Sequence, residues 1–242
     1  MCFVILHKLF LMKELFYRYR YLFLTMGIIS AVVLTLFYNA LKPAKQLPIY
    51  TPAMVNPELV DSLVQYQNNK QKHKIADFSF QNQNNETVTQ DDYKDVIYVA
   101  DFFFTTCPTI CPIMTDNMVW LQEQIKNMPD VKLLSFSVTP DIDTPDVLRK
   151  YADEKGVIDS KWNMVTGDKK AIYYLARQSF LAVKTAEVGE LYDMVHTENF
   201  ILVDKKGRIR GFYDGTLLDE KKEDVKNVKD LLEDIQFLLE NK

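Results

Sequence analysis

Glycine, histidine and cysteine are scarce in this sequence of 242 residues, which contains seven, three and three of them. The low glycine content, together with only nine prolines, excludes collagen-like and low-complexity chains. No segment recurs with a period of roughly 20–50 residues, so solenoids and propellers are also excluded. Aromatic residues make up 12% of the chain and charged residues 26%, which indicates a packed core rather than a disordered chain.

The net charge is −4, but the charges are unevenly distributed along the chain. Residues 1–44 carry five basic side chains and one acidic side chain, Glu14, which leaves 24 basic and 32 acidic residues in the remainder. Binding to a nucleic acid requires many cationic contacts with phosphates, and an acidic globular part does not supply them. We therefore expect no nucleic-acid partner.

Residues 21–41 form a run of 21 residues without a charged side chain. A helix needs about 20 such residues to cross the hydrocarbon core of a bilayer. Arg18 and Arg20 precede the run, and the excess of basic residues on its amino side predicts that residues 1–20 are cytoplasmic. We expect a single-pass protein of the bacterial inner membrane, with its soluble domain on the periplasmic side.

A cleaved signal peptide and a buried soluble helix are the alternatives to an uncleaved anchor. The apolar run is longer than the roughly 7–15 residues of a signal-peptide core. No small-residue cleavage site follows Tyr38, and no cysteine follows the run closely enough for a lipoprotein anchor. The pattern therefore favours a transmembrane signal anchor over residues 21–41.

The soluble domain is expected to follow a linker. Residues 42–57 contain four prolines and few strong helix formers, which predicts an extended tether, and the domain then comprises residues 58–242. Strands are predicted over residues 96–104, 131–138, 162–165, 200–204 and 208–213, with a short hairpin from residue 78, and helices over residues 112–127, 144–156, 168–180 and 225–239. This order predicts an α/β fold with a mixed central sheet flanked by helices, compatible with a thioredoxin-like fold.

Cys107 and Cys111 lie where a predicted buried strand ends and a predicted helix begins, in the sequence FFFTTCPTICP. Sites of α/β proteins lie at the carboxyl ends of strands, and a helix N-terminus favours the thiolate form of cysteine. Three roles are open for the pair: a structural disulfide, a redox-active dithiol and a metal site. A disulfide across so short a loop would stabilise the fold only weakly. The third cysteine, Cys2, is interpreted as an incidental cytoplasmic thiol.

A metal site would need a further ligand beside the two cysteines. Two thiolates suit copper(I) better than a hard cation, and histidine is the expected third ligand. His7 is cytoplasmic by the predicted topology, and His73 lies in the charged run KQKHK, where we expect it to be solvated. His196 precedes the strand predicted from residue 200, where thioredoxin-type oxidoreductases have a cis-proline. This sequence has no proline after Pro145, which weakens the oxidoreductase interpretation and favours His196 as a ligand.

Three stretches together resemble the SCO/SenC family of membrane-anchored copper proteins. They are FFFTTCPTICP around the cysteines, SVTPDIDTPDVL over residues 137–148 and HTENFILVDKKGR over residues 196–208. The resemblance extends over residues 78–213. It implies a thioredoxin-like fold in which Cys107, Cys111 and His196 bind copper, as copper(I) and with copper(II) as a second candidate.

The resemblance also implies a function. It is delivery of copper to, or reduction of the thiols of, the binuclear copper site in subunit II of cytochrome c oxidase. That subunit or another copper protein is the expected partner, together with a protein that reduces disulfides. Such a metallochaperone would have no turnover of its own. The alternative is an enzyme, an extracytoplasmic thiol–disulfide oxidoreductase that acts on protein cysteines with Cys107 and Cys111 as its redox pair.

Two positions depart from the family pattern, in which aspartate is common where this chain has Thr139 and Val195. Neither aspartate is a primary ligand, so copper ligation is expected to survive, whereas partner recognition, copper(II) affinity and redox tuning are left open. Asp143 matches the second acid of the loop after the second strand, and it also fits an ordinary helix start. Asp101, inside an apolar strand, is either a buried acid or a side chain that faces the rim of the sheet, and the sequence leaves both open.

Overall fold

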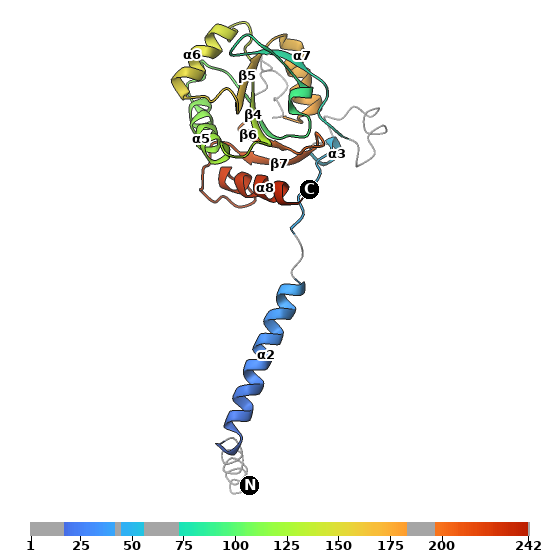
Figure 1. The fold of residues 1–242 in the computed structure, drawn as a ribbon. Coiled ribbons are helices and arrows are strands. Elements are labelled where there is room, and N and C mark those ends of the chain that lie inside the picture. Colours follow the sequence, from blue (N-terminus) through green and yellow to red (C-terminus); the bar gives the residue numbers. More distant parts are fainter. Residues whose placement is uncertain (1–16, 42–44, 56–72, 183–196, 242) are drawn as a thin grey trace. The chain divides into compact units, whose positions relative to one another are not determined.

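The computed structural model describes residues 17–41, 45–55, 73–182 and 197–241 of the chain. The chain forms two compact units, Met1–Gln46 and Leu47–Lys242. The first unit contributes one long helix, and the second contains the sheet and helices that carry the cysteines (Figure 1).

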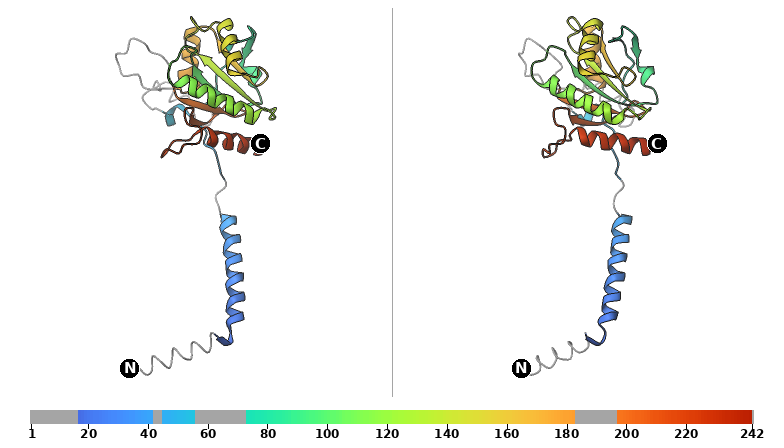
Figure 2. Two further views of the ribbon diagram at one scale, coloured as in Figure 1. Left: turned by 90° about the vertical axis from the view of Figure 1, so that its left-hand side faces the viewer. Right: turned by 60° about the vertical axis from the view of Figure 1, so that its left-hand side comes forward.

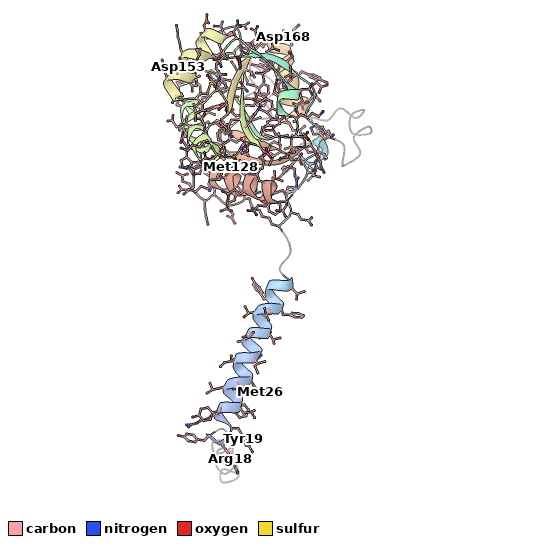
Figure 3. The ribbon with its side chains drawn as sticks, viewed as in Figure 1. Arg18, Tyr19, Met26, Met128, Asp153 and Asp168 are labelled. Carbon is pink, nitrogen blue, oxygen red and sulfur yellow. The ribbon has the colours of Figure 1, made fainter. Side chains whose placement is uncertain are left out.

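The long helix of the first unit is α2 (Arg20–Leu41). From Arg20 to Tyr38 it is long and apolar enough to cross a membrane, with a mean hydropathy of 2.0 and none of that stretch buried. Figure 3 shows its side chains projecting all round the helix, Met26 among them. An apolar helix with a fully exposed surface suits a lipid environment. Signal sequences near an N-terminus meet the same criteria, so the uncleaved anchor stays a prediction.

The second unit is built on a seven-stranded sheet with the strand order β2-β1-β5-β4-β3-β6-β7. The strands are β1 (Ser79–Asn82), β2 (Thr87–Thr89), β3 (Ile97–Phe103), β4 (Val131–Ser137), β5 (Trp162–Thr166), β6 (Asn199–Val203) and β7 (Ile209–Asp214). The three central strands β3, β4 and β5 are parallel, whereas the hairpins β1–β2 and β6–β7 are antiparallel and form the two edges. The predicted mixed sheet is thereby confirmed.

Helices cover both faces of this sheet (Figures 1 and 2). They are α5 (Ile110–Ile125), α6 (Pro145–Lys155), α7 (Lys169–Tyr174), which continues into a π-helical turn over Leu175–Ser179, and α8 (Val228–Glu240). The short helix α3 (Pro52–Val55) lies near the start of this unit in the sequence. One core cluster packs α5, α6 and α8 against one face, and a second packs α7 and the π-helical turn against the other. Strand β3 lies between the two clusters and is buried along its whole length, as its apolar sequence predicts.

Short-range signals determine where the helices begin and end. Thr144 caps α6 by accepting a hydrogen bond from the backbone N of Val147 (3.4 Å), and Gly156 ends α6 in the left-handed conformation, with φ 73°. Asp168, labelled in Figure 3, caps α7 by accepting a hydrogen bond from the backbone N of Ala171 (2.8 Å). These helix ends agree with the predictions from sequence.

The chain enters the second unit at Leu47, whose side chain is buried in the core. Arg210 of β7 donates hydrogen bonds to the backbone O of Leu47 (2.7 Å) and of Pro48 (2.9 Å), and the backbone N of Tyr50 donates to the backbone O of Ile209 (3.0 Å). Part of the predicted linker therefore packs against the edge of the sheet. The predicted boundary at residue 58 lies outside the described residues and stays a prediction.

Candidate metal centre

Cys107 lies in the loop between β3 and α5, and Cys111 lies in the first turn of α5. Both are free thiols, and only 6% and 2% of their surfaces are exposed. A hydrogen bond from the backbone N of Cys107 to the backbone O of Phe104 (3.3 Å) turns the loop. The turn leaves Cys107 Sγ 3.5 Å from the backbone N of Cys111, which donates to it. The loop thus directs the first thiol toward the start of the helix that carries the second.

The two thiols differ in how readily they ionise. Burial alone would raise the pKa of Cys107, but hydrogen bonds from the backbone N–H groups of Thr109 and Cys111 outweigh it and lower that pKa. Burial raises the pKa of Cys111 to about 12, and the charges of Cys107 and Asp101 act in the same direction. Cys107 is therefore the thiol that ionises first. Cys111 ionises readily in two situations. A bound cation can compensate the negative charge of its thiolate, or the thiolate can be consumed as it attacks a disulfide.

Asp101 is a buried acid, which is the first of the two positions that the sequence left open. Ser135 of β4 donates a hydrogen bond to its carboxyl group through Oγ, and Trp162 Nε1 donates to Ser135 Oγ (2.8 Å). Burial raises the pKa of Asp101 to about 7, and the hydrogen bond from Ser135 offsets only part of this increase. A group with this pKa exchanges protons near neutral pH, close enough to Cys111 to influence its ionisation.

Asp143 connects the loop after β4 to the cysteine loop. Its buried carboxylate accepts hydrogen bonds from Thr105 Oγ1 (2.5 Å) and the backbone N of Thr105 (3.2 Å), two residues before Cys107. It also accepts hydrogen bonds from Ser137 Oγ (2.6 Å) and Thr139 Oγ1 (3.0 Å) at the end of β4. The predicted helix start is confirmed in Thr144, which caps α6, whereas the carboxylate of Asp143 itself binds the two loops.

The hydroxyl partners of Asp143 were not identified from sequence. Thr105, Ser137 and Thr139 are ordinary residues when each is considered alone. The available signal was their position, because Phe103 of β3 pairs with Ser137 of parallel β4 and the ends of these strands lie side by side. Hydroxyl groups at the ends of two neighbouring strands, next to one acid, predict a shared hydrogen-bond network.

His196, the predicted third ligand, lies outside the described residues, as do Cys2, His7 and Val195. The described chain resumes at Thr197, which is buried, and β6 begins two residues later. Strand β6 runs antiparallel to β3, with Ile201 opposite Ala100. The start of β6 is therefore next to the carboxyl end of β3, the edge where the cysteine loop begins. Across residues 17–41, 45–55, 73–182 and 197–241, no three His, Cys, Asp or Glu side chains form a group suited to a metal ion.

The prediction that His73 is solvated is wrong. Only 7% of its surface is exposed, and its Nε2 lies 2.8 Å from the backbone O of Ser179. Burial lowers the pKa of His73, although the hydrogen bond to Ser179 acts in the opposite direction. Ile75 and Phe78, just after His73 in the chain, pack into the core. His73 is buried because it lies beside them, although it belongs to the charged run KQKHK. This core cluster lies on the face of the sheet opposite the cluster that contains the cysteines.

Comparisons with known sequences identify relatives of the chain. A family model described as SCO1/SenC matches residues 66–233, a range that includes Cys107, Cys111 and His196. The SCO1 protein homolog of Bacillus subtilis is 35% identical over 164 residues, which cover 66% of this chain and 84% of that protein. The mitochondrial SCO1 homolog of Homo sapiens is 25% identical over 141 residues, which cover 56% of this chain and 46% of that protein.

Solved structures with the same fold include two relatives of similar sequence. A SCO1/SenC family lipoprotein from Bacillus anthracis is 31% identical, with a TM-score of 0.58 and coverage of 70% of this chain and 96% of that chain. BsSco, described as a member of the Sco family of cytochrome c oxidase assembly proteins with a disulfide switch, is 32% identical, with a TM-score of 0.57 and coverage of 70% and 95%. Yeast Sco1 with copper bound is 17% identical, with a TM-score of 0.51 and coverage of 68% and 89%, and supports the fold alone.

Proposed function

Because the chain belongs to the SCO1/SenC family, we propose that it is a membrane-anchored copper protein of cytochrome c oxidase assembly. In this proposal Cys107, Cys111 and His196 bind copper(I). The observation that carries the proposal is the pair of free thiols at the start of α5, one of which points at the backbone N–H of the other. Two thiolates and an imidazole are the soft and borderline ligands that copper(I) prefers.

The thiols would act in a fixed order. Cys107, whose pKa is lowered by backbone N–H donors, supplies a thiolate at lower pH than Cys111 does. Cys111 then gives up its proton when the cation arrives, so that metal binding releases a proton. His196 would contribute a neutral imidazole. Copper(I) itself is the soft cation that would be bound here and transferred to the partner protein.

We propose as partner the binuclear copper site in subunit II of cytochrome c oxidase, or another copper protein outside the cytoplasm. If the two cysteines of that site are oxidised, the Cys107 thiolate attacks one sulfur of their disulfide and forms a mixed disulfide. The Cys111 thiolate then attacks Cys107 Sγ, which leaves the partner with two thiols and this chain with a Cys107–Cys111 disulfide. A separate disulfide-reducing protein must reduce that disulfide before copper binds again.

The second candidate function is thiol–disulfide exchange without copper. The lowered pKa of Cys107 favours it, because the attacking group in such exchange is a thiolate. An oxidoreductase would use the same two cysteines and would not need His196. Copper affinity is therefore the property that separates the two functions.

An anaerobic copper(I) titration of the full chain in detergent tests the proposal. In a Cys2→Ser background, replacement of His196 by Ala should weaken copper(I) binding by at least tenfold, about 1.4 kcal/mol. His7→Ala is the matched control and should bind like its parent, because the predicted topology puts His7 on the other side of the membrane. An oxidoreductase would bind copper(I) through its thiols alone, and His196→Ala would then leave the affinity unchanged.

A further inference from the structure

The carboxylate of Asp143 is the centre of a hydrogen-bond network that joins two loops. None of its surface is exposed, and it accepts four hydrogen bonds at 2.5–3.2 Å. Two come from Thr105 of the cysteine loop, and two come from Ser137 and Thr139 at the end of β4. All four contacts donate to it, so the group is accommodated as a carboxylate that accepts and does not donate.

The backbone around Asp143 holds this carboxylate in place from the β4 side. The backbone N of Ile142 and that of Asp143 both donate to the backbone O of Thr139, each at 2.9 Å, which folds the loop back on itself. The backbone N of Val138 donates to Phe103 O at 2.9 Å and joins the end of β4 to the end of β3. The conformation of the loop after β4 is thus held by backbone hydrogen bonds. The cysteine loop is bound to it by the hydrogen bonds from Thr105 to Asp143.

The network contains no cation among the residues that the structure describes. The ion pair in this loop belongs to Asp141, whose carboxylate lies 4.0 Å from Lys169 Nζ and whose side chain is 82% exposed. Asp143 instead depends on neutral hydroxyl and amide donors, which satisfy a buried carboxylate without removing its charge. The carboxylate of Asp143 is thereby bound to Thr105, which lies two residues before Cys107 in the chain.

We infer that Asp143 is the positioning residue of the thiol pair. By binding Thr105, it holds the loop in the turn that brings Cys107 Sγ to the backbone N of Cys111. Among the described contacts it touches neither thiol, so it acts through the cysteine loop. The copper part of this inference rests on the proposed function, whereas the part that concerns the two thiols does not.

Three variants of the full chain, in detergent and in the Cys2→Ser background, test the inference. Asp143→Asn keeps the side-chain volume but removes the charge and one acceptor. Thr105→Val removes only the hydroxyl donor and leaves the carboxylate with its other three hydrogen bonds. Asp141→Asn removes the same charge from an exposed position of the same loop and is the matched control.

Two measurements accompany thermal unfolding: copper(I) affinity against a chromophoric copper(I) chelator, and the midpoint potential of the cysteine pair in glutathione buffers. Asp143→Asn should weaken copper(I) binding at least tenfold. It should also lower the equilibrium constant for disulfide formation about tenfold, which moves the potential about 30 mV less negative. Thr105→Val should shift both quantities in the same direction by a smaller amount, and Asp141→Asn should shift neither.

The outcomes separate this inference from the proposed function. If Asp143→Asn lowers the melting temperature but matches Asp141→Asn in affinity and potential, Asp143 is only structural and the inference is overturned. If Asp143→Asn does not fold, Thr105→Val decides, and unchanged affinity and potential in that variant also overturn the inference. If the parent chain binds no copper(I) while Asp143→Asn still shifts the potential, the inference stands and the proposed function fails.

Discussion

Asp101 lies in β3, Cys107 in the loop after that strand and Cys111 in the first turn of α5, and their environments give them different protonation behaviour. Backbone N–H donors lower the pKa of Cys107, whereas burial raises that of Cys111 and that of Asp101. Burial is the largest effect on all three groups, and only at Cys107 do hydrogen-bond donors outweigh it. The cysteine pattern predicted a favoured thiolate at the helix N-terminus, which agrees with Cys107 but not with Cys111, where burial reverses the effect. Burial of Cys111 and Asp101 depends on what packs against β3 and α5, which the sequence pattern does not reveal.

Asp101→Asn should reduce the pH dependence of stability. The pKa of Asp101 is about 7 in the folded chain against an ordinary 3.8, so its protonated form is favoured by folding and the contribution is fully present below about pH 4. That contribution is lost as the pH rises to about 7, by up to ~4 kcal/mol at about 1.4 kcal/mol per pKa unit. Urea unfolding of the copper-free chain should therefore show a smaller loss between about pH 4 and pH 7 in the variant.

Asp141→Asn serves as the control for this experiment, since its carboxylate is exposed and its removal should leave the pH dependence of the parent chain intact. Equal losses of stability in Asp101→Asn and the parent would contradict the account, because they would mean that another group binds the proton.

The helix and strand features that the sequence predicts correctly are those set by residues close together in the chain. The buried run of β3, the Thr144 cap, the Gly156 end of α6 and the strand–turn–strand signal around Gly207 each need only a short window of sequence. His73 was predicted wrongly for the opposite reason. It is buried with Ile75 and Phe78 in the core and forms a hydrogen bond with Ser179, more than a hundred residues away in the chain, which a short window of sequence does not reveal.

Some features of the candidate site were likewise predictable from local sequence, and others were not. The cysteine pair and the helix after it were predictable from spacing and from the strand before them. The hydrogen bonds that Asp143 accepts from Thr105 join residues 38 positions apart, and they could not be derived without the pairing of β3 with β4. His196 was proposed from chemistry and from the family resemblance, and it stays a prediction.

Gly156→Ala tests how the end of α6 is determined. Gly156 has φ 73°, and a Cβ added there would meet no heavy atom within 4 Å, so the cost is conformational rather than steric. The free energy of unfolding should fall by about 1 kcal/mol. Gly156→Asn should lose less, because asparagine tolerates the left-handed conformation better than alanine does. Equal stability of the Ala variant and the parent in urea unfolding would contradict this explanation.

In the residues that the structure describes, an exposed apolar helix belongs to the first unit, and the second unit is globular and acidic. Its basic residues before α2 predict a cytoplasmic amino end. The globular unit would then lie in the compartment where a dithiol can cycle with a disulfide and where an extracytoplasmic copper site is assembled. The proposed function therefore depends on the topology, which can be tested separately from copper binding.

Alkaline phosphatase fused to the carboxyl end of the chain tests the topology, because this reporter is active only outside the cytoplasm. The full-length fusion should be active in bacterial cells. A matched fusion that lacks residues 1–41 should be inactive, since it has no segment to direct export. Activity confined to the truncated fusion, or absent from the full-length fusion, would rule out the predicted anchor and the periplasmic location.

The central claim is that Cys107, Cys111 and His196 together hold copper(I). X-ray absorption spectroscopy of the copper(I)-loaded full chain, in the Cys2→Ser background, measures the ligands directly. We expect two sulfur ligands and one nitrogen ligand per copper in the parent, and loss of the nitrogen in His196→Ala. Coordination by sulfur alone in the parent, with the same spectrum in His196→Ala, would contradict the claim and favour the thiol–disulfide oxidoreductase.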